Sequence, residues 1–394
     1  MKKFGAFVRL LIISSMTKLA DLLVSPKTTL PWLITATGAP SWLIPMLVPV
    51  KESGSLLPQW ILRTTLVHQF ENRMTFWRIG MAVQGIGIVS LVLSVFWSDP
   101  MWLSVIWILL LFAIAFGRSI CSLTMKDIQG SNVEKGRRGR LVGAASSISG
   151  ALTIVTSLAL LWFGDKDNVL AVKLLIVSGG ALFLFAMLPS LAMQTRIDDA
   201  KESSPRLREI FAVVSENQAL RSLIISRSLL LHSALVLPFI VALSASTERF
   251  DLPIFMILSA IASLLSSYVW GALSDKSAVL TLKISSFICV IAAMGAGFLE
   301  SNAVPLYAYI CFFTLSIGHA GIRTGRKTYI LDITEKGERT TYVAIANTLV
   351  GVVLLLLGGV YALLENALGS MVLLVMATVL VLGFLHTFML APEK

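Results

Sequence analysis

Long apolar stretches separated by short polar segments make up almost the whole chain. A membrane-spanning helix needs roughly 20 apolar residues, and twelve stretches reach that length. None shows the strict alternation of a barrel strand, and lipid offers backbone groups no partner, so each stretch is expected to be a helix. The predicted spans are 8–33, 41–62, 76–97, 101–124, 140–163, 168–191, 221–245, 252–273, 280–299, 303–325, 341–363 and 368–390.

Composition excludes a soluble protein. Hydrophobic residues make up 56% of the chain and charged residues only 14%, whereas about a quarter of the residues in a soluble domain are charged. An all-α integral membrane protein is therefore predicted. The net charge of +10 fits the same class, because basic loops face the anionic inner leaflet of a membrane. We expect the lipid bilayer, and no nucleic acid, as a partner.

Basic residues gather in every second gap between the predicted spans. Such loops stay on the cytoplasmic side, so the bias predicts that both termini are cytoplasmic and that the chain lies in the plasma (inner) membrane. The basic gaps contain Arg63, Arg73, Arg78, Lys126, Lys135, Arg137, Arg138, Arg140, Arg196, Lys201, Arg206, Arg208, Lys276, Arg326, Lys327, Lys336 and Arg339. The other gaps contain Asp99, Asp165, Lys166, Asp167, Glu248, Arg249, Asp251, Glu300 and Glu365.

The two halves of the chain repeat one another. The longest polar stretch follows the sixth span, so we predict a six-helix bundle over 1–193, a cytoplasmic linker over 194–219 and a second six-helix bundle over 220–394. Two spacings are the same in both halves: nine residues from an arginine to an aspartate, and sixteen residues from a glutamate to a glycine. The matched pairs are Arg118–Asp127 with Arg323–Asp332, and Glu134–Gly150 with Glu335–Gly351. A weaker match aligns Ile12–Ser14 with Ile224–Ser226, and Pro26 with Pro238.

Three short motifs accompany this repeat. Residues 271–276 read G-A-L-S-D-K, residues 134–143 read E-K-G-R-R-G-R-L-V-G, and Arg118 lies near the end of the fourth predicted span. Together with the repeat, they resemble the major facilitator superfamily. That resemblance implies a transporter whose first, fourth, seventh and tenth helices line a central cavity. The chain departs from the family pattern in three places. The loop at 60–69 lacks the expected Gly and Asp, Arg118 is not followed by the usual Gln-Gly, and the helix at 141–161 lacks the proline of drug antiporters.

Charged side chains inside the predicted spans are the main candidates for a functional site. An ion at the bilayer centre is costly, so it normally faces a cavity or a partner. Prolines beside several of them predict broken or bent helices with free carbonyl groups. Two other interpretations stay open: a static network of mutually neutralised charges, and arginines that extend to the interface. The candidates for proton coupling and the cavity are Lys18, Asp21, Lys27, Lys51, Glu52, Arg118, Arg227, His232 and Arg323.

Charges at the cytoplasmic ends of the spans are candidates for a gate. Gly271 would allow close helix approach, and Asp275 can pair with a basic residue across the gate. The alternative is that these charges only hold the topology. The full set is Gly271, Asp275, Lys276, Asp127, Glu134, Arg138, Asp332, Glu335 and Arg339.

Three function classes compete at this point. The first is a secondary transporter for a small solute that works by alternating access and is coupled to protons through Asp21 or Glu52. The second is a non-transporting scaffold with the same fold, against which the costly buried charges argue. The third is a membrane enzyme, but the sequence contains no catalytic constellation, metal-ligand spacing or cofactor motif. We expect a monomer without metal or cofactor. Because cations predominate in the expected cavity, an anionic solute is favoured.

Topology can be tested directly. Reporter tags at Met1, within 199–206 and at Lys394 should all report the cytoplasmic side, because an even number of spans returns the chain to its starting face. A reporter that is active only outside the cytoplasm provides the control. An external signal at either terminus would contradict the repeat.

Overall fold

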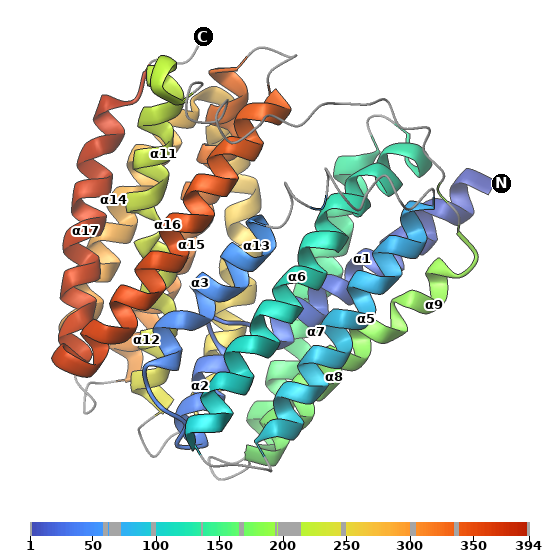
Figure 1. Ribbon diagram of the computed structural model, residues 1–394, viewed down its shortest axis with the longest axis horizontal. Helices are drawn as coiled ribbons and strands as arrows, with labels where there is room; N and C mark the ends of the chain where they lie inside the picture. Colours follow the sequence, from blue (N-terminus) through green and yellow to red (C-terminus); the bar gives the residue numbers. More distant parts are fainter. Residues whose placement is uncertain are drawn as a thin grey trace.

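The computed structural model describes residues 2–57, 62, 72–95, 100–134, 137–164, 169–193, 195, 214–245, 250–299, 305–334 and 339–391. Long helices dominate this part of the chain (Figure 1), as the predicted fold class requires. They are α1 (Lys2–Leu23), α2 (Thr29–Ala36), α3 (Leu43–Leu56), α5 (Arg73–Ser94), α6 (Pro100–Asn132), α7 (Arg138–Phe163), α8 (Val169–Phe185), α9 (Met187–Ser190), α11 (Gln218–Leu230), α12 (His232–Ala245), α13 (Leu252–Lys276), α14 (Ala278–Ala296), α15 (Pro305–Asp332), α16 (Arg339–Leu368), η3 (Gly369–Met371), α17 (Val372–His386) and η4 (Thr387–Met389).

Nine helical stretches within the described residues are long and apolar enough to cross a membrane. One of them, Tyr342–Met389, is 48 residues long and contains both α16 and α17. The two helices meet at Gly369, whose φ of 54° lies in the left-handed region that glycine tolerates. The number of twelve spans and their division into two bundles remain predictions.

The predicted continuous helix over 8–33 is wrong. α1 already begins at Lys2 and ends at Leu23, and α2 starts only at Thr29. Pro26 lies in the break: it has no N–H to donate, and its ring disfavours the helical conformation of Ser25. The break therefore follows from Pro26, which agrees with the expectation that prolines beside intramembrane charges break or bend helices.

The predicted spans 101–124 and 303–325 are too short. α6 continues to Asn132 and α15 to Asp332. A helix of 33 residues is about 50 Å long, more than the roughly 30 Å of the hydrocarbon core, so polar residues past the bilayer need not end it. Arg118 and Asp127 therefore lie on one helix. The predicted span 221–245 is also divided, at Leu231, into α11 and α12.

Contacts between the two halves follow the repeat. A Cβ atom built on Gly150 of α7 would lie 3.4 Å from Leu264 of α13. One built on Gly351, its repeat counterpart on α16, would lie 3.2 Å from Leu57 at the end of α3. Ser53 Oγ also donates to the Gly351 carbonyl at 2.8 Å. In Figure 1 the first half lies on the right and the second half on the left.

The lower end of the molecule in Figure 1 is closed by contacts between the halves. α2 packs on α12, and the rings of Trp32 and Phe250 meet edge to face with centroids 5.4 Å apart. Ser41 Oγ donates to Glu365 Oε2 at 3.0 Å. A positive φ of 67° at Gly38 makes the turn that returns the chain from α2 to α3.

At the upper end, where α6 and α15 finish, α7 and α13 pack less closely than they do lower down. Within the described part of the chain, a Cβ atom at Gly143 of α7 or at Gly271 of α13 would meet no atom within 4 Å. At Gly150, lower on α7, the contact with α13 is present. α7 and α13 therefore diverge toward the upper end.

Glycine allows α5 and α6 to approach closely. A Cβ atom on either Gly80 or Gly117 would lie 2.7 Å from the carbonyl oxygen of the other. That distance is too short for real atoms, and backbone oxygens cannot move aside as a flexible side chain can. Small residues at such crossings are the usual way in which membrane helices pack.

Gly117→Ala should lower the free energy of unfolding by roughly 1–2 kcal/mol, because overpacking costs about 1–3 kcal/mol and exceeds the gain in helix propensity. Gly143→Ala is the matched control: its Cβ meets open space, so better helix propensity should raise stability by up to about 1 kcal/mol. Thermal unfolding of the purified protein measures both. Equal effects of the two substitutions would contradict the packing argument.

Candidate functional site

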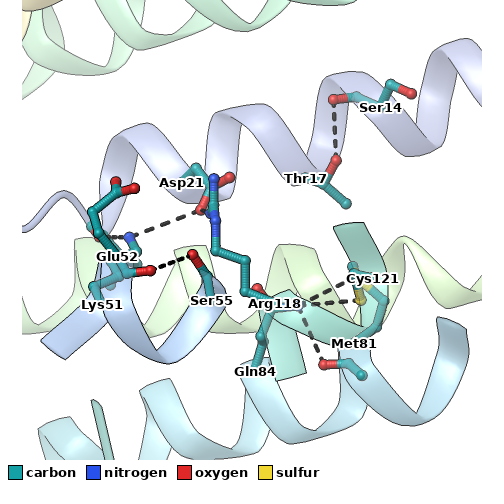
Figure 2. A network of polar contacts seen from close by, with 12 residues as sticks. Ser14, Thr17, Asp21, Lys51, Glu52, Ser55, Met81, Gln84, Arg118 and Cys121 are labelled. Carbon is teal, nitrogen blue, oxygen red and sulfur yellow. Dashed lines mark hydrogen bonds and ion pairs between the residues drawn. The ribbon is translucent and has the colours of Figure 1, made fainter. Parts of the chain in front are cut away.

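Asp21 is the centre of an ion-pair network between three helices of the first half (Figure 2). Arg118 Nη1 of α6 donates to Asp21 Oδ1 of α1. Lys51 Nζ of α3 lies 3.8 Å from the same oxygen. The Asp21 side chain is 29% exposed, whereas that of Lys51 is only 10% exposed. One carboxylate therefore faces two cations.

The break after α1 contributes to the same network. Lys51 Nζ donates to the Val24 carbonyl at 3.0 Å, one residue past the last turn of α1. A continuing helix would use that carbonyl for its own backbone. The proline-dependent break thus supplies an acceptor that helps to hold a buried lysine.

Arg118 also lies beside a buried polar pair that the sequence interpretation missed. Gln84 of α5 is buried, and its Nε2 donates to the Gly80 carbonyl at 3.2 Å and to Cys121 Sγ at 3.3 Å. Cys121 lies three residues after Arg118 on α6, so these groups pack together on one side of the network (Figure 2). No pattern in the apolar run around Gln84 distinguished it.

Glu52 has a different environment from its neighbour Lys51. Its side chain is exposed, yet it lies within electrostatic range of Arg118, Lys27, Arg326 and Lys51. These cations come from α6, from the α1–α2 break, from α15 and from α3. Because Glu52 is exposed and yet lies among charges from both halves, we infer that it faces a solvent-accessible space between the halves and not lipid. Within the described residues, no cation lies within 4.0 Å of it.

Cations predominate around this space, and most of them come from the second half. Lys27 interacts electrostatically with Arg323 and Arg326 of α15, and Arg227 of α11 with Arg326. Arg227 Nη1 donates to Asn347 Oδ1 of α16 at 2.8 Å, which is a neutral partner. Glu52 is the carboxylate within electrostatic range of Lys27, Arg227 and Arg326. We call Lys27, Arg227, Arg323 and Arg326 the basic cluster.

A family model described as Major Facilitator Superfamily matches residues 61–358. The chain belongs to the major facilitator superfamily. The sequence resemblance is thereby confirmed, and with it an integral membrane protein of a transporter family. Transporters of this kind are generally not enzymes.

Solved transporter structures share the fold at low sequence identity. A mutant of the nucleoside transporter NupG aligns with a TM-score of 0.73 and 11% identity, covering 98% of this chain and 99% of that one. A POT family transporter in complex with a thioalcohol-conjugated peptide aligns with a TM-score of 0.70 and 11% identity, covering 97% of this chain and 94% of that one. A bacterial metal transporter aligns with a TM-score of 0.63 and 14% identity, covering 99% of this chain and 98% of that one. A comparison with curated protein sequences returned no significant match. These likenesses establish the fold only.

Two candidate residues make their hydrogen bonds outside the Asp21 network, although Lys18 stays within electrostatic range of Asp21 and Arg323. Lys18 Nζ reaches α7, where it donates to the Val142 carbonyl at 2.9 Å and to Ser146 Oγ. His232 is buried on α12: its Nδ1 contacts the Leu229 carbonyl at 2.7 Å, and its ring meets Tyr361 edge to face with centroids 5.5 Å apart. His232 thus packs within the second half.

The gate candidates make contacts within their own halves. Asp127 Oδ2 lies 3.6 Å from Arg73 Nε, and Glu134 Oε2 lies 3.9 Å from Arg137 Nη1. Arg138 Nη2 donates to the Gly130 carbonyl at 2.6 Å.

The second-half gate candidates lie at the upper end. Asp275 and Lys276 are exposed at the end of α13, Asp332 ends α15 and Arg339 begins α16. Gly271 makes no close helix contact within the described residues. Glu335 lies outside the described residues.

The sequence interpretation missed Arg326 of the basic cluster and its neighbour His319. With Arg323 they are spaced four and three residues apart on α15, which places all three on one face of a helix. His319 lies within electrostatic range of both arginines and of Lys27. The predicted span ended at residue 325, so Arg326 was assigned to a loop. The spacing would have revealed the face once the helix was extended.

Asp21→Asn should destabilise the protein by roughly 1–2 kcal/mol, because buried Lys51 loses its carboxylate and the more exposed pair with Arg118 contributes less. The reason is that Arg118 and Lys51 would then face each other without a carboxylate. Thermal unfolding measures the loss, and Asp21→Asn/Arg118→Gln completes a double-mutant cycle. The double substitution should cost less than the sum of the single ones. Additive losses would show that the pair does not interact.

Proposed function

We propose that the chain is a secondary transporter that moves a small anionic solute across the membrane by alternating access. The observation that carries this proposal is the basic cluster around a solvent-accessible space with Glu52 as its nearby carboxylate. A region of one charge sign concentrates ligands of the opposite sign. Arginine also holds carboxylates and phosphates through two parallel hydrogen bonds. A cationic solute would meet repulsion from the same residues.

The described conformation supports an inward-facing assignment within the proposed cycle. The halves meet at the lower end through Trp32–Phe250 and Ser41–Glu365, whereas Gly143 and Gly271 are open at the upper end. The positive-inside pattern assigns the upper end to the cytoplasm. We therefore place both termini in the cytoplasm and the chain, as a monomer, in the inner membrane. In the outward-facing state the upper-end charges would meet across the gate.

Proton coupling is assigned to Glu52 in preference to Asp21. Asp21 is already in contact with Arg118 and Lys51, so its carboxylate is engaged within the first half. Glu52 has no such direct contact within the described residues and faces the space that the solute enters. An anion that enters this space competes with ionised Glu52 for the same cations. Protonation of Glu52 removes that competition, so proton and anion would bind together.

The main alternative is a scaffold that keeps the transporter fold without moving a solute. The basic cluster argues against it, because a scaffold gains nothing from charges that repel one another inside the membrane. Transport by the purified protein distinguishes the two. Uptake of no solute by a correctly folded protein would favour the scaffold.

Proteoliposomes test function and coupling together. Uptake of small organic anions and inorganic phosphate should rise with an inward-directed proton gradient. Glu52→Gln should abolish the dependence on the gradient but retain anion exchange, because a neutral side chain still leaves the cations free. Glu216→Gln, which changes an exposed carboxylate before α11, is the matched control. Unchanged gradient-driven uptake in both Glu52→Gln and Asp21→Asn would exclude this coupling, and uptake of cations alone would exclude the anion.

A further inference from the structure

The repeat predicts equivalent environments for Arg118 and Arg323. They occupy matching positions on α6 and α15. α1 packs on α6 in the first half, and α12 packs on α15 in the second. In the first half the partner of the arginine is Asp21. The second half should therefore hold an equivalent partner on α12.

The equivalent position contains no acid. The matches of Ile12–Ser14 with Ile224–Ser226 and of Pro26 with Pro238 place Ser233 at the position of Asp21. The structure agrees with this alignment: Ser233 is fully buried and contacts α15 at His319, where its Oγ lies 2.9 Å from Nδ1. His319 is one helical turn before Arg323. A serine thus stands where the first half has a carboxylate.

His319 does not replace the missing negative charge, because an imidazole ring is either neutral or positive. Ser233 Oγ donates its hydrogen to the Leu230 carbonyl at 2.7 Å, and its lone pairs face His319 Nδ1 at 2.9 Å. In either state the ring balances none of the positive charge of Lys27, Arg323 and Arg326.

Arg323 consequently lacks the counter-ion that its repeat partner has. In the part of the chain that the structure describes, no carboxylate lies within 4.0 Å of Arg323 or Arg326. Glu52 interacts with Arg326 only at longer range. The Arg323 side chain is exposed and Arg326 is partly so. Neither residue is buried, so neither side chain is fully enclosed by the described residues.

We propose that Arg323 and Arg326 form the subsite for the carboxylate or phosphate group of the solute, which takes the place that Asp21 fills in the first half. Arg118 is then already paired with Asp21 and does not bind the solute. The inference rests on the proposed function in one respect, the anionic character of the solute. It adds where the anion binds and why only one of the two repeat-related arginines binds it.

The missing counter-ion can be tested without any ligand. Ser233→Asp should raise the thermal unfolding midpoint at neutral pH, because it places a negative charge close to positive groups that repel one another. Ser233→Asn has the same size without charge and should not raise it. Arg323→Gln should also raise or maintain the midpoint, whereas Arg118→Gln should lower it because Asp21 loses the cation that donates a hydrogen bond to it. A drop with Arg323→Gln as large as with Arg118→Gln would overturn the asymmetry.

Binding provides the second measurement, with inorganic phosphate and succinate as probes of the purified full-length protein. At least one probe should stabilise the wild type. Arg323→Gln, Arg326→Gln and Ser233→Asp should each weaken its binding about tenfold or more, the loss of one charged contact. Arg118→Lys should bind like the wild type. Lys283→Gln, on α14 over the Phe388 ring, is the charge-matched control.

The outcomes separate the two proposals. If a probe binds but the Arg323, Arg326 and Ser233 variants bind it like the wild type, the subsite is wrong and the anion transporter stands. If Arg118→Lys loses binding as strongly as Arg323→Gln, both arginines bind the solute and the asymmetry is wrong. If neither anion stabilises the wild type and uptake of both fails, the subsite and the proposed function fall together.

Discussion

The cost of placing ions within a membrane protein is the constraint on which the site depends. A charge at membrane depth must have a partner or face water. Asp21 shows the first solution, since it contacts Arg118 and Lys51 from two other helices. The break after Leu23 belongs to the same solution, because it frees the Val24 carbonyl for Lys51. Backbone geometry and side-chain charge are thus coupled in the first half.

Much of the fold follows from the apolar pattern alone. Runs of about 20 apolar residues predict helices with few exceptions, because lipid excludes other backbone structures. The ends of those helices were less predictable. α6 and α15 extend past the bilayer to Asn132 and Asp332, where hydropathy no longer distinguishes helix from loop. The break at Pro26 depends on where one proline lies within a span, which hydropathy does not register.

The candidate site was predicted in its residue types but not in its pairings. Intramembrane charge marked Asp21, Lys51 and Arg118 as important, because each is costly to bury. Which cation contacts which carboxylate depends on the packing of separate helices, and one sequence does not contain that information. Arg326 was missed for a local reason, the helix end at residue 325. Gln84 was missed because a single amide in an apolar run has no distinguishing pattern.

The difference between the two halves gives the repeat its functional meaning. The sequence repeat places Arg118 and Arg323 at matching positions. A charge that is paired at one of these positions and left without a counter-ion at the other is not a requirement of the fold. The Arg118–Asp21 pair shows that this helix pairing can accommodate a carboxylate, and Ser233 shows that the second half does without one. Repulsion between Arg323, Arg326 and Lys27 costs stability in the empty state. Proteins tolerate such local costs mainly at functional sites, and an anion that enters between the halves would relieve this one. The same anion would contact α15 of the second half and approach Lys27 and Glu52 of the first. Its binding would therefore be sensitive to the relative position of the halves, which is the property that alternating access requires.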